Sequence, residues 1–139
     1  MQLKGAEKVL EVGAGSGYAA AVLSRLCARV FTIERVAELA RMAKENLAAA
    51  GIANVEVRRD DGSRGWPEEA PFDAILVSAG AEEIPKALLD QLAVGGRLVV
   101  PIAQDGNEQE LVRIVRKGRI EFHQENLAAV RFVPLIVER

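Results

Sequence analysis

The feature that most constrains the fold of this chain is an apolar run that ends in a glycine-rich turn. Residues 9–18 have the sequence VLEVGAGSGY, with glycines at positions 13, 15 and 17. The apolar part predicts a buried strand, and glycines where a strand leads into a helix let the backbone approach a ligand closely. Such turns hold NAD, FAD, nucleotides or S-adenosylmethionine, so the surrounding residues have to distinguish these ligands.

The rest of the chain alternates between strand and helix patterns. Because parallel strands need crossover connections, this alternation predicts a mainly parallel sheet with helices on both faces. Asp60–Pro71 carries Gly, Pro and charge and predicts a loop with one helical turn. The predicted strands are Lys8–Val12, Val30–Ile33, Asn54–Arg58, Phe72–Val77 and Arg97–Ile102, and the predicted helices are Tyr18–Cys27, Val36–Ala50 and Glu82–Leu92.

From Glu110 onward the pattern contains strands without intervening helices. We therefore predict an α/β, Rossmann-like fold whose sheet ends in an antiparallel C-terminal edge. No internal repeat or linker divides the chain, so residues 1–139 are expected to form a single domain. The predicted C-terminal strands are Leu111–Val115, Ile120–Phe122 and Val130–Val137, with a turn at Lys117-Gly118.

Composition narrows the function classes. Eighteen basic and twenty acidic residues give a net charge of −2, which provides no broad positive field for nucleic acid. The polar N-terminus lacks the apolar core of a secretory signal, and no run reaches membrane-spanning length. The single cysteine, Cys27, lies among apolar residues and is expected to be a buried thiol. We expect a cytoplasmic protein that binds neither membranes nor nucleic acid.

Two local features are expected to be structural. Arg113, Arg116, Lys117 and Arg119 surround the Lys117-Gly118 turn, and a solvated hairpin tip explains this concentration of charge. His123, the only histidine, is expected to be an exposed strand residue. No metal site is predicted.

Tyr18 and Glu11 favour S-adenosylmethionine over NAD. Tyr18 occupies the position of the third glycine in the dinucleotide pattern G-x-G-x-x-G. Glu11 precedes the first glycine by two residues, where it would repel an anionic pyrophosphate but attract the ammonium and sulfonium groups of S-adenosylmethionine. The structural alternative for Glu11 is a half-exposed residue at a strand end.

Acidic positions also follow the next two predicted strands. A carboxylate at Glu34 can accept hydrogen bonds from both ribose hydroxyls, as in NAD sites; the alternative is an N-cap for the helix beginning at Val36. At Asp61-Gly62 the carboxylate can accept an adenine amine and the glycine admits backbone N–H groups near the ring. The alternative there is a tight turn.

Several blocks, in order, resemble the protein-L-isoaspartate O-methyltransferases, a family of class I S-adenosylmethionine-dependent methyltransferases. The first block is generic to class I enzymes, whereas GGRLVVP followed by VRFVPL is more specific. The blocks are VLEVGAGSGY at 9–18, FTIER at 31–35, Asp61-Gly62, Gly65-Trp66-Pro67, APFDAIL at 70–76, Ser78–Ala81, GGRLVVP at 95–101 and VRFVPL at 130–135.

The resemblance implies methyl transfer from S-adenosylmethionine to the free α-carboxylate of an L-isoaspartyl residue, or to the side-chain carboxylate of a D-aspartyl residue, in damaged proteins. S-adenosylhomocysteine is the product, and the ester then cyclises to a succinimide. The implied cofactor-binding residues are Glu11, Gly13, Ala14, Gly15 and Gly17 around the methionine part, Glu34 on the ribose, Arg35 and Val36 beside the adenosine, Asp61 and Gly62 at the adenine, and Gln109, which matches a glutamine near the family's cofactor site.

This chemistry asks little of acid–base residues, because an α-carboxylate with a pKa of roughly 3.5 is already ionised at neutral pH. Family members carry a serine-containing segment ahead of the glycine strand, and here only eight residues precede Val9. We therefore expect that segment to be absent and assign no catalytic residue. The expected consequences are weaker cofactor binding, poor or absent methyl transfer, and self-association through uncovered apolar surface.

Four other functions compete with this one. A base-methylating enzyme would carry an Asn/Asp-Pro-Pro-aromatic motif after the fourth strand, where this chain has Ser78–Ala81. A core that binds S-adenosylmethionine without catalysis, or a methyltransferase for a small molecule, shares the same cofactor residues. An NAD-dependent oxidoreductase is disfavoured by Tyr18 and Glu11.

Overall fold

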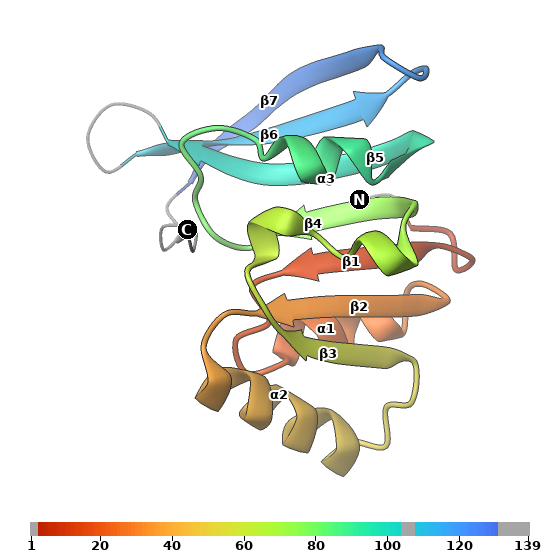
Figure 1. Ribbon diagram of the computed structural model, residues 1–139, viewed down its shortest axis with the longest axis vertical. Coiled ribbons are helices and arrows are strands. Elements are labelled where there is room, and N and C mark those ends of the chain that lie inside the picture. The colour runs from red at the N-terminus through yellow and green to blue at the C-terminus, as the bar shows by residue number, and fades with distance from the viewer. Residues whose placement is uncertain (1–2, 104–107, 131–139) are drawn as a thin grey trace.

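A seven-stranded sheet forms the centre of the molecule. The computed structural model describes residues 3–103 and 108–130, and within them the strand order is β3-β2-β1-β4-β5-β6-β7 (Figure 1). Strands β1 to β5 are parallel, and β6 and β7 pair antiparallel at one edge, as predicted. The strands are β1 Lys8–Val12, β2 Arg29–Glu34, β3 Val55–Arg59, β4 Phe72–Val77, β5 Leu92–Ala103, β6 Gln109–Arg116 and β7 Phe122–Val130.

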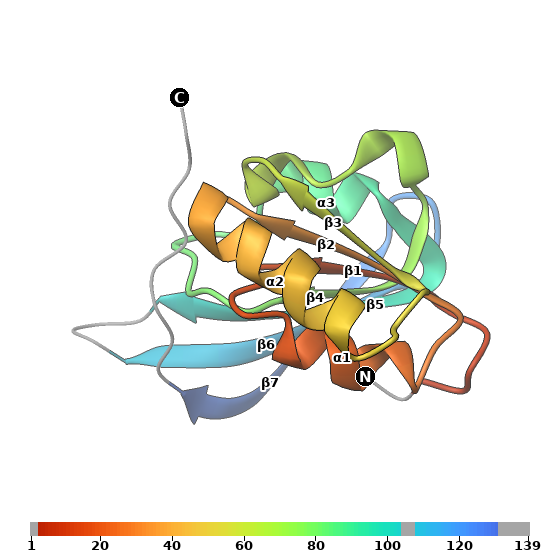
Figure 2. The same cartoon turned by 90° about the horizontal axis from the view of Figure 1, so that it is seen from below.

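Helices cover both faces of the parallel half of the sheet (Figure 2). Helix α1, Tyr18–Ser24, and helix α2, Ala37–Ala49, lie on one face. Helix α3, Lys86–Asp90, lies on the other, with two 3₁₀ turns, η1 at Gly62–Arg64 and η2 at Pro67–Glu69, in the β3–β4 connection. No helix among the described residues is long and apolar enough to cross a membrane.

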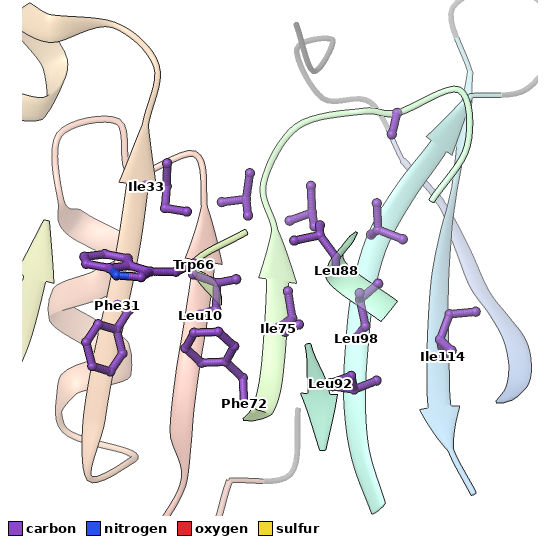
Figure 3. Close-up of a cluster of buried hydrophobic side chains, with 14 of the residues drawn as sticks. Leu10, Phe31, Ile33, Trp66, Phe72, Ile75, Leu88, Leu92, Leu98 and Ile114 are labelled. Atoms are coloured by element: carbon purple, nitrogen blue, oxygen red, sulfur yellow. The ribbon is translucent and has the colours of Figure 1, made fainter. Parts of the chain in front are cut away.

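The described residues form two core clusters, one on each face of the sheet. Because parallel strands are buried on both faces, successive residues of one strand enter different clusters: Val9 packs with α1, whereas Leu10 packs on the α3 side. On that side Trp66 and Phe72 meet Phe31 edge to face, with ring centroids 5.1 and 5.9 Å away (Figure 3). The β3–β4 loop therefore contributes to the core.

Several predicted boundaries are wrong. Helix α1 ends at Ser24, three residues before the predicted end. Helix α3 begins only after Pro85, which has an extended ψ of 128° and serves as its N-cap. Strand β5 begins at Leu92, ahead of the glycine pair, because Leu92 pairs with Phe72 before the register shifts.

The C-terminal hairpin also differs from the prediction. The backbone N–H of Lys117 donates to the carbonyl of Glu121, so the turn extends to residue 121 and β7 begins at Phe122. The polar stretch after Phe122 forms a strand because an edge strand can expose both its faces. His123 is exposed, as expected. The predicted strand Val130–Val137 lies outside the described residues apart from Val130.

The basic residues around this turn do not all form a solvated tip. Lys117 and Arg119 are exposed, but Arg113 forms an ion pair with Glu125 on β7. Arg116 points back toward the end of α3. Its Nη1 donates to the carbonyl of Leu92 at 2.6 Å, and its guanidinium lies 5.3 Å from the ring centroid of Phe122. The expectation of a purely solvated cluster is therefore wrong for Arg113 and Arg116.

Replacing Arg116 by alanine is expected to lower the free energy of unfolding by about 1–3 kcal/mol, since carbonyl groups near the α3–β5 junction lose a charged donor. Lys117→Ala, one residue away on the exposed turn, is the control and should change stability by less than about 0.5 kcal/mol. Urea denaturation followed by circular dichroism measures both. Equal effects of the two substitutions would contradict this role of Arg116.

Candidate functional site

The predicted binding residues gather where β1, β2 and β3 end. These three strands are neighbours and parallel, so their carboxyl ends open at the same edge of the sheet, where α/β proteins bind ligands. The glycine turn follows β1, Glu34 is the last residue of β2, and Asp61-Gly62 comes shortly after β3. The structure therefore brings together residues that are far apart in the sequence.

The glycine turn is held against the end of β2. The backbone N–H of Gly13 donates to the carbonyl of Ile33 at 2.8 Å, and the buried Ala14 donates to the same carbonyl. Gly17 has φ +93°, and a Cβ there would lie 3.3 Å from the Cα of Ala43 in α2. A side chain at position 17 would therefore be strained and would push α1 and α2 apart.

Glu34 joins the glycine turn to the segment entering α2. Its Oε1 accepts the N–H of Gly15 at 2.9 Å, and its Oε2 accepts the N–H of Val36 at 3.0 Å. Because Val36 is itself the N-cap of α2, Glu34 binds no N–H of the first helical turn, and the N-cap interpretation is wrong. Each carboxylate oxygen has two lone-pair sites, so both oxygens can accept a further donor.

Glu11 is fully buried, which contradicts the alternative of a half-exposed strand-end residue. The hydroxyl of Thr32, its register partner on β2, donates to Oε1 at 2.6 Å, whereas the buried Oε2 has no hydrogen-bond partner in the described part of the chain. Desolvation raises the pKa of Glu11 to about 7; the Thr32 hydrogen bond opposes this shift and the charge of Glu34 adds to it. Near neutral pH, Glu11 thus exchanges between its neutral and ionised forms.

Asp61 is a buried carboxylate that caps the turn η1. Its Oδ1 accepts the backbone N–H of Ser63 at 3.0 Å and the Ser63 hydroxyl at 2.8 Å. A Cβ on Gly62 would lie only 2.3 Å from Cγ1 of Val12, so β1 and this turn are in tight contact. The turn interpretation of Asp61-Gly62 is therefore confirmed, and the proposed contact with adenine stays a prediction.

Of the remaining predicted residues, Arg35 directly follows Glu34, whereas Gln109 lies on a different strand. Arg35 is half-buried in the β2–α2 connection, where its backbone carbonyl accepts a hydrogen bond from Nε of Arg59 at 3.1 Å. Gln109 begins β6, which is separated from β1 by β4 and β5. A Cβ on Gly80 would lie 1.9 Å from Nε2 of Gln109, so this buried amide rests on the loop after β4 rather than on the glycine turn.

Sequence reasoning missed two groups of this site. Thr32 is the hydrogen-bond partner of Glu11. Aligning β1 with β2 in register places its hydroxyl opposite the glutamate, and this alignment could have identified it. Ser78 follows β4; its N–H donates to the carbonyl of Val12 at 2.9 Å, and a Cβ on Gly13 would lie 3.6 Å from its own Cβ. No local pattern around Ser78 indicates that contact.

The arrangement suits a ligand that carries positive charge and hydroxyl groups. Glu11 has an unpartnered buried oxygen, Glu34 can accept further donors, and three of the five residues in the turn between them are glycines. An anionic pyrophosphate would meet acidic groups here. The geometry thus supports the electrostatic argument against a dinucleotide.

Comparison with known protein families gives a match along the whole chain. The family model for protein-L-isoaspartate(D-aspartate) O-methyltransferase matches residues 1–139. A protein-L-isoaspartate O-methyltransferase 1 of Rhodopseudomonas palustris is 57% identical over 98% of this chain, and a homologue from Pelobacter propionicus, named protein-L-isoaspartate O-methyltransferase 2, is 52% identical over 98%. The chain spans 56% and 60% of the lengths of these two relatives.

Solved structures agree. A protein-L-isoaspartate O-methyltransferase structure superposes with a TM-score of 0.88 at 34% identity, over 95% of this chain and 43% of that one. A crystal structure from Plasmodium falciparum, described as a candidate protein-L-isoaspartate O-methyltransferase in complex with S-adenosyl-L-homocysteine, superposes with a TM-score of 0.76 at 31% identity, over 94% of this chain and 66% of that one.

Burial of Glu11 predicts a pH-dependent stability. The pKa of Glu11 is about 7 in the folded chain and 4.5 as the unperturbed value, so the folded state binds more protons between these limits. The contribution of Glu11 to the free energy of unfolding is complete below pH 4.5 and is lost as the pH rises through 7. This loss amounts to about 3 kcal/mol.

Glu11→Gln removes this titration. The free energy of unfolding of the wild-type chain, relative to this variant, should therefore fall between pH 5 and 7 and level off above about pH 8. Urea denaturation across this range measures the difference. Glu56→Gln, at a half-exposed position on β3, is the control and should run parallel to the wild type. A parallel curve for Glu11→Gln would refute the raised pKa.

Proposed function

Since the chain belongs to the protein-L-isoaspartate(D-aspartate) O-methyltransferase family, we propose that it binds S-adenosylmethionine and methylates damaged aspartyl residues in proteins. The acceptors are the free α-carboxylate of L-isoaspartyl residues and the side-chain carboxylate of D-aspartyl residues. The observation that carries the proposal is the carboxylate of Glu34, fixed by the N–H groups of Gly15 and Val36 with lone pairs left for a ribose.

Each group at the edge of the sheet has a part in holding the cofactor. Gly13, Ala14, Gly15 and Gly17 line the methionine portion, where the absence of long side chains lets the backbone approach. Glu34 accepts the ribose hydroxyls, and Arg35 and Val36 flank the adenosine. Asp61 accepts the exocyclic amine of adenine beside Gly62, and Gln109 supports the loop after β4.

Glu11 provides the charge for a cationic ligand. Its buried Oε2 has no hydrogen-bond partner, and burying a carboxylate without a counter-charge is costly. A neighbouring ammonium or sulfonium would stabilise the ionised form and lower the pKa of Glu11. S-adenosylmethionine supplies both cations and an activated methyl group.

The reaction itself requires alignment rather than proton transfer. An isoaspartyl α-carboxylate has a pKa of roughly 3.5 and is ionised at neutral pH, so it can attack a methyl group without a general base. His123 fits this picture, since it is exposed on β7 beside Glu121, and β4, β5 and β6 separate β7 from the strand that carries the glycine turn. Residues 1–139 are proposed to form one domain that carries out this chemistry in the cytoplasm. Self-association of this domain is proposed as well.

Glu34→Gln is expected to weaken S-adenosylhomocysteine binding at least tenfold. The amide nitrogen cannot accept from a backbone N–H or from the ribose, and one hydrogen bond to a charged group contributes about 1.5–3 kcal/mol. Isothermal calorimetry measures the dissociation constant. Glu56→Gln, which makes the same change on the exposed side of β3, should bind like the wild-type chain. Equal affinities for Glu34→Gln and the wild type would remove Glu34 from the site.

Methyl transfer is tested with tritiated S-adenosylmethionine and a peptide pair that differs only in one aspartyl linkage. We expect a low level of label in the isoaspartyl peptide, as a base-labile ester, and none in the normal peptide, because only the former presents a free α-carboxylate at that residue. Cofactor binding without labelling would favour the non-catalytic core. Labelling of tRNA or duplex DNA instead would point to a different acceptor.

A further inference from the structure

Gln91 is a buried amide that connects α3 and β5 to the loop after β3. Its Oε1 accepts the backbone N–H of Trp66 at 2.8 Å, and its Nε2 donates to the carbonyl of Arg64 at 2.9 Å. The two peptide groups lie on either side of Gly65. One side chain thus satisfies a donor and an acceptor of a segment that belongs to no strand.

Gly65 makes this close approach possible. A Cβ at this position would lie 2.2 Å from Oε1 of Gln91. Gly65 also has φ +64°, a backbone angle that residues with a side chain rarely adopt. The backbone of Gln91 is tied to the sheet, because its carbonyl accepts the N–H of Phe72 at the start of β4. The amide therefore projects from a fixed point of the sheet.

The segment that Gln91 holds is continuous with the proposed adenine-binding turn. The N–H of Gly65 donates to the carbonyl of Gly62 at 3.0 Å, and Asp61 caps the same 3₁₀ turn. At its far end Trp66 is buried against Phe31. Any rotation of the peptide planes around Gly65 would therefore move Gly62 and the Asp61 carboxylate.

We propose that Gln91 is a positioning residue of the cofactor site: its two hydrogen bonds hold the peptide groups around Gly65, and through the turn η1 they set the placement of Asp61 and Gly62. This proposal rests on the proposed function for the identity of the ligand. Its structural part, the ordering of the loop, can be tested in the free protein. Gln91 has no chemical part in methyl transfer.

The substitution Gln91→Glu offers a reversible test of the two bonds. An ionised carboxylate at position 91 can still accept the N–H of Trp66, but it has no donor for the Arg64 carbonyl. The carboxylate oxygen and that carbonyl oxygen therefore repel each other. Protonation restores a donor, so a low pH should restore both bonds. Gln91→Met keeps the approximate volume and removes both bonds at every pH.

The surroundings of the amide bear on this titration. Arg116 donates to the carbonyls of Asp90 and Leu92 on both sides of position 91, and its charge favours an ionised carboxylate there. Asp90 opposes this but is paired with Lys86. On the loop side, the side chain of Arg64 is exposed and directed to Asp61. Burial raises the pKa of a carboxyl group at this position, so recovery is expected below neutral pH.

Trp66, the single tryptophan of the chain, reports on the loop directly. We would record its emission in the ligand-free protein, and S-adenosylhomocysteine affinity by calorimetry, at pH 7.5 and 5.5 for the wild type, Gln91→Glu and Gln91→Met. Gln124→Glu, at an exposed position on β7, is the matched control. Affinities are expressed relative to the wild type at the same pH, because Glu11 itself titrates. Far-UV circular dichroism confirms that each variant is folded.

At pH 7.5 we expect Gln91→Glu to shift the Trp66 emission to the red and to weaken binding at least tenfold. At pH 5.5 both should return toward the wild type, with affinity within about threefold, whereas Gln91→Met should stay impaired and Gln124→Glu unchanged. The proposal would be overturned if the folded Gln91 variants had the Trp66 emission of the wild type, or if they bound S-adenosylhomocysteine with wild-type affinity. It would also be overturned if the emission and affinity of Gln91→Glu did not recover at low pH. A wild-type chain that binds no S-adenosylhomocysteine would refute the proposed function, while the Trp66 emission would still decide the role of Gln91.

Discussion

Parallel pairing of β1 with β2 on one side and β4 on the other is the constraint on which the site depends. The pairing places Glu11 opposite Thr32 and brings the Gly13 N–H to the Ile33 carbonyl. On the other side it holds Ser78 against the end of β1. A one-residue slip would turn every side chain of β1 to the other face and would move Glu11 into the apolar cluster around Leu10, so the core on the two faces specifies these polar neighbours.

The site combines two carboxylates with opposite surroundings. Glu34 is satisfied by two backbone N–H groups, whereas Glu11 has one hydroxyl donor and a bare oxygen. Burial without enough donors raises the pKa of Glu11 to about 7. A cationic ligand would relieve this cost, which couples binding to the ionisation of Glu11.

Strongly periodic segments were predictable from the sequence. Strand β4 has the predicted bounds, and α2 lies within one residue of its predicted ends, because each has a distinct apolar pattern and a clear stop. The prediction failed where tertiary contacts override local pattern. Strand β5 passes through Gly95 and Gly96 because β4 pairs with it. Arg116 donates both to the hairpin turn and to carbonyls near the end of α3, so it joins two segments instead of being solvated.

Sequence alone determined the fold class, the succession of strands and helices along the chain, and the residues Glu11, Glu34 and Asp61 at strand ends, because strand periodicity and glycine turns are local properties. Only the tertiary structure decided how these carboxylates are satisfied. The burial of Glu11 against Thr32, the two N–H donors on Glu34 and the Gln91 amide behind the loop all join segments distant in the chain. Such contacts depend on strand register and side-chain packing, which no local pattern encodes.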